Sequence, residues 1–220
     1  MVNNNGSNPS SLTLRLPLNG QKIQMNNVTA VILAGGRSNR MGVSAKAMLM
    51  FGGETLLSRI SNRIAPQADR LLINGDPRFL VNSQYPVIED RTDPFSGPLA
   101  GLYSALVDPS ALESEYILVV PCDSPFVPID LATSLLAAMG DADIACARYE
   151  GIPQPTFSLW HRRQTDVITK ALLGRGDGGF KPLMTELDTV YVDWVESAVN
   201  PFLNINTPDD MQLAEGFLCL

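Results

Sequence analysis

Short apolar runs alternate along the chain with longer stretches in which apolar residues recur at helical spacing. The apolar runs predict buried strands at residues 29–34, 70–74, 86–90, 116–120, 142–147, 156–160 and 189–194. The stretches with helical spacing predict helices at residues 54–65, 98–107, 131–139, 161–173, 180–187 and 208–217. Asp130 is expected to cap the third of these helices, and Gly174 is expected to end the fourth. Strands that alternate with helices predict an α/β fold with a mainly parallel sheet.

The first 27 residues differ from the rest of the chain, because they are rich in Asn and Ser and contain no acidic residue. Their apolar stretch, Leu12–Leu18, is broken by polar residues and a proline, unlike the continuous core of a secretory signal. We expect a disordered N-terminal extension without a targeting role at residues 1–27 and a single domain at residues 28–220. No apolar run reaches the roughly 18–20 residues that span a bilayer, so a cytoplasmic location is expected.

The net charge of −7 argues against a protein that coats nucleic acid, which would normally be basic. The charge is uneven, however, since residues 1–68 contain seven basic residues and one acidic residue. This basic segment favours an anionic ligand. The three cysteines are far apart and there is one histidine, His161, so a zinc site is not expected. We expect reduced, buried thiols, a solvated helix start at His161, and Mg²⁺ held by carboxylates and water if a metal binds.

A glycine-rich loop with three cations follows the first predicted strand. Gly35, Gly36 and Gly42 allow backbone amides to approach phosphate oxygens, and the surrounding cations are Arg37, Arg40 and Lys46. The spacing fits neither the P-loop pattern GxxxxGK(S/T) nor the dinucleotide pattern GxGxxG. The loop therefore predicts a polyphosphate site of another kind, and the alternative is a strand-to-helix connection with surface arginines.

In parallel sheets ligands bind beyond the carboxyl ends of the strands. The residues at or just beyond the ends of predicted strands here include Gly35, Asn74, Asp90 and Asp123. Asp123 is a hard carboxylate at the mouth of a buried strand, which suits Mg²⁺ bound to phosphate oxygens. Turn or loop aspartates are the alternative interpretation for Asp90 and Asp123.

Four motifs in order resemble those of the MobA-like nucleotidyltransferases. They are the loop Leu33–Gly42 with Lys46, then Gly97-Pro98-Leu99-Ala100-Gly101, then Pro121-Cys122-Asp123-Ser124-Pro125, and finally Asn204-Ile205-Asn206-Thr207-Pro208-Asp209-Asp210. The resemblance covers about residues 28–217, and Gly35-Gly36 favours the guanylyl branch, the molybdenum cofactor guanylyltransferases, over the cytidylyl branch. It implies a Rossmann-like three-layer α/β/α sandwich of the nucleotide-diphospho-sugar transferase type.

The resemblance also implies roles for individual residues. Lys46 and Asp123 would be catalytic, with Asp123 as the magnesium ligand. The GTP-binding residues would be Leu33, Ala34, Gly35, Gly36, Lys46, Asn74, Asp90 and Asp123. The molybdopterin-binding residues would be Arg40, Gly42, Gly97, Gly101, Asn204 and Asn206, with amides at the start of the helix at 98–107 available to a phosphate. Lys181 and the glycine-rich loop at 174–179 are further candidates for the pterin phosphate, whereas Thr207 is expected to be a helix cap.

The implied reaction is transfer of GMP from GTP to the phosphate of molybdopterin, with release of pyrophosphate. The implied partners are these substrates and, transiently, cofactor-synthesis or acceptor proteins, with no nucleic acid or membrane and a monomeric state. One departure from the family pattern is Ala45, where the family usually has Asp before the loop lysine. The alternatives are a molybdopterin cytidylyltransferase, a sugar-phosphate nucleotidyltransferase and a non-catalytic nucleotide-binding regulator.

Overall fold

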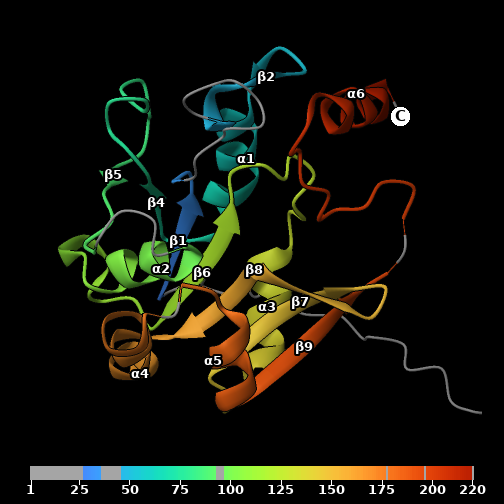
Figure 1. The fold of residues 1–220 in the computed structure, drawn as a ribbon. Coiled ribbons are helices and arrows are strands. Elements are labelled where there is room, and N and C mark those ends of the chain that lie inside the picture. The colour runs from blue at the N-terminus through green and yellow to red at the C-terminus, as the bar shows by residue number, and fades with distance from the viewer. Residues whose placement is uncertain (1–26, 36–45, 93–96, 177, 196, 220) are drawn as a thin grey trace, which may run out of the picture.

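The computed structural model describes residues 27–35, 46–92, 97–176, 178–195 and 197–219. Within these residues seven strands form one sheet in the order β5-β4-β1-β6-β8-β7-β9 (Figure 1). The strands are β1 (Val28–Leu33), β4 (Arg70–Asn74), β5 (Val87–Ile88), β6 (Tyr116–Pro121), β7 (Ile144–Tyr149), β8 (Ile152–His161) and β9 (Thr189–Trp194). β8 runs antiparallel to both neighbours, and the other pairings in this sheet are parallel. The predicted mainly parallel sheet is confirmed.

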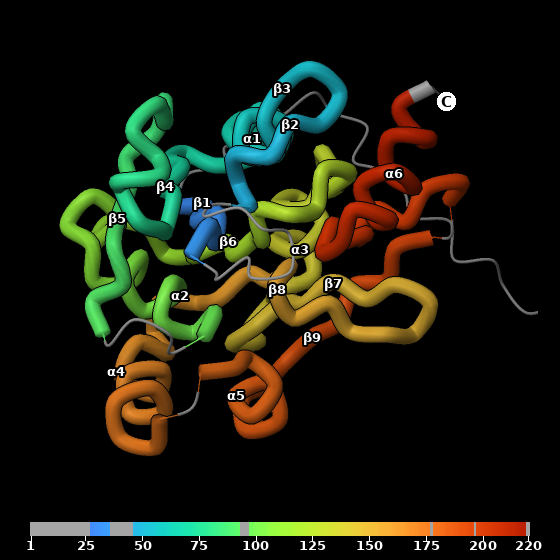
Figure 2. The backbone as a smooth tube through the Cα atoms, turned by 45° about the horizontal axis from the view of Figure 1, so that its top comes forward, coloured from blue at the N-terminus to red at the C-terminus, as the bar shows by residue number. Residues whose placement is uncertain are grey.

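Helices cover both faces of the sheet, because alternate residues of each strand point to opposite sides. On one face, Ala30 and Ile32 of β1 belong to a core with α1 (Leu56–Ile64) and α3 (Leu131–Met139). On the other face, Val31 belongs to a core with α2 (Pro98–Leu106), α4 (Thr165–Thr169) and α5 (Lys181–Glu186). Figure 2 shows α2, α4 and α5 together on one side of the sheet. The structure is therefore a three-layer α/β/α sandwich.

A β-hairpin that the sequence pattern did not predict precedes α1. Its strands, β2 (Met50–Phe51) and β3 (Glu54–Thr55), pair antiparallel across Gly52 and Gly53. The φ angles of these glycines are +60° and +88°, a region that glycine enters without steric cost. Because strand residues occupy positions 54 and 55, α1 begins at Leu56 rather than at the predicted position.

One predicted helix end was wrong, and one predicted cap is confirmed in position only. The helix expected at 161–173 is composite, with a 3₁₀ helix at Arg162–Gln164, then α4, then a π-helical segment at Lys170–Arg175. Gly174 lies inside this last segment, and Gly176, with φ +73°, follows its end instead. Asp130 occupies the N-cap position of α3, but its side chain makes no capping hydrogen bond.

The last helix, α6 (Pro208–Gly216), packs beside the hairpin at the top of Figure 1. Phe51 and Leu56 share a small apolar cluster with Ile205 and Ala214. This packing brings the C-terminal part of the chain to the segment that follows the glycine-rich loop. Further 3₁₀ helices lie at Lys46–Met48, Ala65–Gln67, Pro109–Ala111 and Phe217–Cys219.

The thiols of Cys122 and Cys146 are buried and free, as the sequence predicted. Burial raises the pKa of each thiol to about 12, so neither is a nucleophile at neutral pH. None of the helices in the described ranges has the length and apolar character needed to cross a bilayer. The extension expected at 1–27 lies outside the described residues except for Asn27.

Candidate functional site

Four neighbouring strands end in register at one edge of the sheet. Leu33 pairs with Asn74 on one side and with Pro121 on the other, and Asn74 pairs with Ile88. The residues at and just beyond the ends of these strands therefore form a row in the order Asp90, Asn74, Ala34–Gly35 and Asp123. Three strand spacings of about 4.8 Å give this row a span of about 14 Å. The parallel register thus brings these strand-end residues together, on a scale that suits an extended nucleotide.

Asn74 joins the two strands at the β5 side of this row. Its side-chain Nδ2 donates hydrogen bonds to Asp90 Oδ1 at 2.9 Å and to the Ile88 carbonyl at 3.4 Å. Its carbonyl accepts a hydrogen bond of 2.7 Å from the Ala34 amide. Asn74 is only 4% exposed, so its amide group is fixed by the protein and orients the Asp90 carboxylate.

Gly101 of α2 is buried directly against Leu33 and Asn74. A Cβ at position 101 would lie 2.4 Å from Leu33 Cδ2 and 2.5 Å from Asn74 Oδ1. The helix can pass this close to the strand ends because the residue has no side chain. Gly101 thus contacts two residues predicted to bind GTP, although the sequence grouped it with Asn204 and Asn206.

Lys46, Asp123 and Asn206 form the second group of the site. The Lys46 Nζ donates to Asp123 Oδ2 at 2.6 Å and to Asn206 Oδ1 at 2.8 Å. The side chains of Lys46 and Asp123 are 15% and 18% exposed, so this ion pair is largely shielded from water. The other carboxylate oxygen, Asp123 Oδ1, is buried and has no hydrogen-bond partner among the described residues.

The segment that carries Asn206 is held against the end of β6. The Ser124 hydroxyl donates to Asn204 Oδ1 at 2.5 Å, and the Ile205 amide donates to the Asp123 carbonyl at 2.9 Å. Asn204 and Asn206 are exposed while Ile205 is buried between them, which confirms that the two asparagines share a face. They lie beside Asp123, and their predicted contact with molybdopterin stays a prediction.

A capping box fixes the end of the same segment. The Thr207 hydroxyl accepts from the Asp210 amide, and Asp210 Oδ2 accepts from the backbone amides of Asn206 and Thr207. The Asn206 amide is the main reason why the pKa of Asp210 is lowered. The predicted cap at Thr207 is confirmed. Asp210 was missed as a supporting residue, although a Thr followed three positions later by an acid indicates such a box.

The start of α2 offers less to a phosphate than the sequence suggested. The Leu99 amide donates to the Gly178 carbonyl at 3.1 Å, and the Ala100 amide donates to the Gly97 carbonyl at 3.1 Å. Gly97 has φ +73°, and a Cβ there would lie 2.4 Å from the Gly178 oxygen. The expectation of free helix-start amides is corrected, because the glycine-rich loop at 174–179 already uses one of them.

Other predicted residues lie away from these two groups or outside the description. Gly36, Arg40 and Gly42 lie outside the described residues. Lys181 is the exposed first residue of α5. His161 ends β8 opposite Tyr116, at the edge of the sheet remote from the site. Its side chain is 17% exposed, so the expected solvated helix start is wrong, although it does cap the following 3₁₀ helix.

Asp123 is the residue that fits a magnesium ion. No cluster of three or more His, Cys, Asp or Glu side chains suited to a metal occurs in the described parts of the chain. Mg²⁺ in nucleotide sites often uses one or two carboxylates, with substrate phosphates and water as the remaining ligands. A buried carboxylate oxygen without a partner is unfavourable, and a cation would relieve it.

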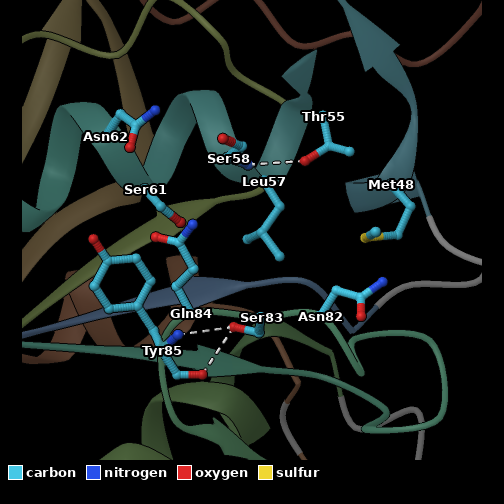
Figure 3. A pocket seen from close by; sticks show the side chains of 10 residues that line it. All are labelled: Met48, Thr55, Leu57, Ser58, Ser61, Asn62, Asn82, Ser83, Gln84 and Tyr85. Atoms are coloured by element: carbon cyan, nitrogen blue, oxygen red, sulfur yellow. Dashed lines mark hydrogen bonds between the residues drawn. The ribbon is translucent and has the colours of Figure 1, made fainter.

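A separate cavity of about 80 Å³ lies between the start of α1 and residues 82–85 (Figure 3). Its lining carries hydroxyl and amide groups and no charged side chain; it consists of Met48, Thr55, Leu57, Ser58, Ser61, Asn62, Asn82, Ser83, Gln84 and Tyr85. None of the predicted site residues lines it. The candidate site is therefore the row of strand ends and not this cavity.

Fold and strand-end residues together define a nucleotidyltransferase domain, and residues 30–190 match the family model described as MobA-like NTP transferase domain. The chain is 38% identical over 192 residues to molybdenum cofactor guanylyltransferase of Rhodopseudomonas palustris (strain BisB5), covering 84% of this chain and 91% of the relative. It is 35% identical over 191 residues to the protein of that name from Vibrio parahaemolyticus, covering 86% and 95%. This chain belongs to the molybdenum cofactor guanylyltransferase family.

Solved structures show the same fold at lower identity. Molybdopterin-guanine dinucleotide biosynthesis protein A from Archaeoglobus fulgidus has a TM-score of 0.72 at 22% identity, covering 87% of this chain and 98% of that one. The 4-diphosphocytidyl-2C-methyl-D-erythritol synthase from Anaerococcus prevotii has a TM-score of 0.64 at 13% identity, covering 89% and 100%. The fold is therefore shared between a guanine dinucleotide biosynthesis protein and a synthase of a cytidyl compound.

Proposed function

We propose that this protein transfers GMP from GTP to the phosphate of molybdopterin and releases pyrophosphate. The observation that carries the proposal is the Lys46–Asp123 pair at the end of β6, beside the strand-end backbone at Leu33–Gly35. Relatives at 35–38% identity are named for the corresponding activity. Their similarity extends over most of this chain and therefore includes both halves of the site.

The two groups of the site would bind different parts of the nucleotide. Asn74 and Asp90 offer a fixed amide and a carboxylate that suit the hydrogen-bond donors of guanine or ribose. The Lys46 ammonium neutralises phosphate charge as it develops during transfer. Asp123 would hold Mg²⁺, and that ion, when bound, would neutralise the triphosphate and polarise a phosphoryl oxygen.

The acceptor would approach from the exposed side of Asp123. Asn204 and Asn206 present side-chain amides there, and we assign them with Gly97, Arg40 and Gly42 to the molybdopterin side of the site. Gly101 was grouped with them in the sequence, but it packs against Leu33 and Asn74 and supports the nucleotide side instead. A phosphate nucleophile is already anionic, so direct attack on the α-phosphorus requires no general base. The position of His161 at the opposite edge of the sheet agrees with this.

The test is a pyrophosphate-release assay with molybdopterin and either GTP or CTP. We expect turnover with GTP, loss of turnover on removal of divalent metal, and at least about a hundredfold lower kcat in Asp123→Ala and Lys46→Ala. Lys170→Ala removes an exposed lysine elsewhere and is expected to behave as wild type. Normal guanylylation by both site variants would refute the site, and equal turnover with CTP would refute the choice of nucleotide.

A further inference from the structure

We propose that Lys46 is a resident cation on Asp123, which keeps a free divalent metal off this carboxylate until a polyphosphate arrives. The inference rests on the proposed function, because it concerns the metal-nucleotide site assigned there. The inference predicts the order in which the divalent cation and the nucleotide bind. A divalent cation is expected to bind together with the nucleotide and not before it.

Neither oxygen of Asp123 is open to an ion that arrives directly from solution. Asp123 Oδ2 is engaged by the Lys46 Nζ at 2.6 Å. Asp123 Oδ1 is buried below the surface. A divalent ion that reached this carboxylate from solution would have to displace the ammonium group from Oδ2.

Asn206 makes that displacement harder. Its Oδ1 accepts a second hydrogen bond of 2.8 Å from the Lys46 Nζ. The Asn206 backbone is itself held, because its amide donates to Asp210 Oδ2 at 2.8 Å. The ammonium is therefore fixed by two residues and is not a freely rotating surface lysine. The neutral amide adds no negative charge that would attract a metal.

The charge balance points the same way. Lys46 and Asp123 together are neutral, and the Asp210 carboxylate near Lys46 adds one negative charge, so a divalent ion alone would still leave excess positive charge in a partly buried site. Repulsion between an ammonium and a divalent ion is strong at such short range. A nucleoside triphosphate brings about four negative charges, which accommodate both cations at once. Lys46 can then bond to phosphate oxygens and release Asp123 Oδ2.

The test measures binding of Mn²⁺ to the full-length protein without nucleotide, by electron paramagnetic resonance. We expect Lys46→Met to bind one Mn²⁺ at least about tenfold more tightly than wild type, because it removes the competing charge from Asp123. Lys46→Gln keeps a polar side chain at this position and is expected to show the same gain. The double variant Lys46→Met/Asp123→Asn is expected to lose it.

Lys170→Met is the matched control, because it removes one exposed positive charge elsewhere on the chain. It is expected to leave Mn²⁺ affinity unchanged, which separates a local effect from the change in net charge. The proposal is overturned if wild type binds Mn²⁺ as tightly as the Lys46 variants, or if their gain persists without Asp123. The assay involves no turnover, so it can succeed or fail independently of GMP transfer.

Discussion

The geometry of this site depends on the absence of a side chain at one residue, Gly101. The residue lies in α2, where the helix touches both the end of β1 and the amide of Asn74. That amide in turn holds Asp90 through a hydrogen bond of 2.9 Å. A change at position 101 should therefore reach the predicted nucleotide site without altering any residue that contacts the ligand.

Gly101→Ala is expected to lower the free energy of unfolding by about 1–3 kcal/mol, because its Cβ would overlap Leu33 and Asn74. Displacement of the Asn74 amide should also weaken GTP binding by about tenfold, the scale of one lost hydrogen bond. Denaturant unfolding and calorimetry measure the two effects. Gly174→Ala is the control, since a Cβ at position 174 meets nothing within 4 Å and Ala favours helix. Equal behaviour of the two variants would contradict this role of Gly101.

His161 is the one histidine of the chain, and it should make stability depend on pH. Burial, and then the nearby positive charge of Arg163, lower the pKa of His161 below its ordinary value of 6.5. The unfolded chain therefore binds more protons in the range just below 6.5, so the folded state loses stability as the pH falls through that range.

His161→Asn should flatten this pH dependence. The imidazole Nδ1 accepts a hydrogen bond from the Arg163 amide at 3.2 Å, and an Asn side chain can replace this cap without titrating. The measurement is denaturant unfolding at about pH 7.5, 6.5 and 5.5, which brackets the ordinary histidine pKa. An unchanged slope between pH 6.5 and 5.5 in the variant would show that other groups cause it.

At the scale of elements, the segment from Asn204 to Asp210 acts as one unit. Successive residues hold Ser124, the Asp123 carbonyl and the Lys46 ammonium, and the capping box anchors their backbone to α6. The segment that carries Lys46 also packs against α6. The hairpin that follows its 3₁₀ helix shares an apolar cluster with Ala214.

Thr207→Ala should therefore loosen α6 and lower the free energy of unfolding by about 1 kcal/mol, the usual loss for a removed N-cap. Thr207→Ser keeps the hydroxyl that accepts from the Asp210 amide and should retain most of the stability. Urea unfolding of both variants beside wild type gives the comparison. A loss of the same size in Thr207→Ser would attribute the effect to the methyl group and not to the cap.

At the scale of the whole molecule, Arg162 ties β8 to the connection between α2 and β6. Its guanidinium donates to the carbonyls of Leu106 at 2.6 Å and Ser114 at 2.5 Å, and also to that of Ala111. Burial lowers the pKa of this arginine. The sequence placed Arg162 in a solvated stretch, yet its side chain bonds to three carbonyls within residues 106–114.

Arg162→Met should lower the free energy of unfolding by about 2–4 kcal/mol, because three carbonyls lose a charged donor together. Arg162→Lys should rescue little, since an ammonium cannot reproduce the fork of the guanidinium. Arg78→Met is the control, because the Arg78 side chain is 83% exposed and pairs with Asp76 at the surface. A comparable loss in Arg78→Met would remove the special role of Arg162.

The elements that the sequence pattern predicted correctly are those whose buried residues follow one another closely along the chain. β4 and β6 are near-continuous apolar runs, and α2 starts at Pro98 where the sequence placed it. The β2–β3 hairpin was not predicted, because each of its strands has two residues, which are too few to show a hydrophobic period. The π-helical segment was not predicted, because Gly174 resembles a helix stop. Packing of Ala171 and Leu172 into the core keeps the chain helical to Arg175.

The sequence by itself determined the alternation of strands and helices, the polar residues that follow the strands, and the cap at Thr207, because each depends on neighbours a few positions away. Only the tertiary structure decided which of those residues meet. Lys46 contacts Asp123 and Asn206 across 77 and 160 positions of the chain. Those contacts depend on strand order and on the packing of α6, which no local pattern encodes. The buried Asp123 Oδ1, which has no hydrogen-bond partner within the described parts of the chain, arises from the same packing.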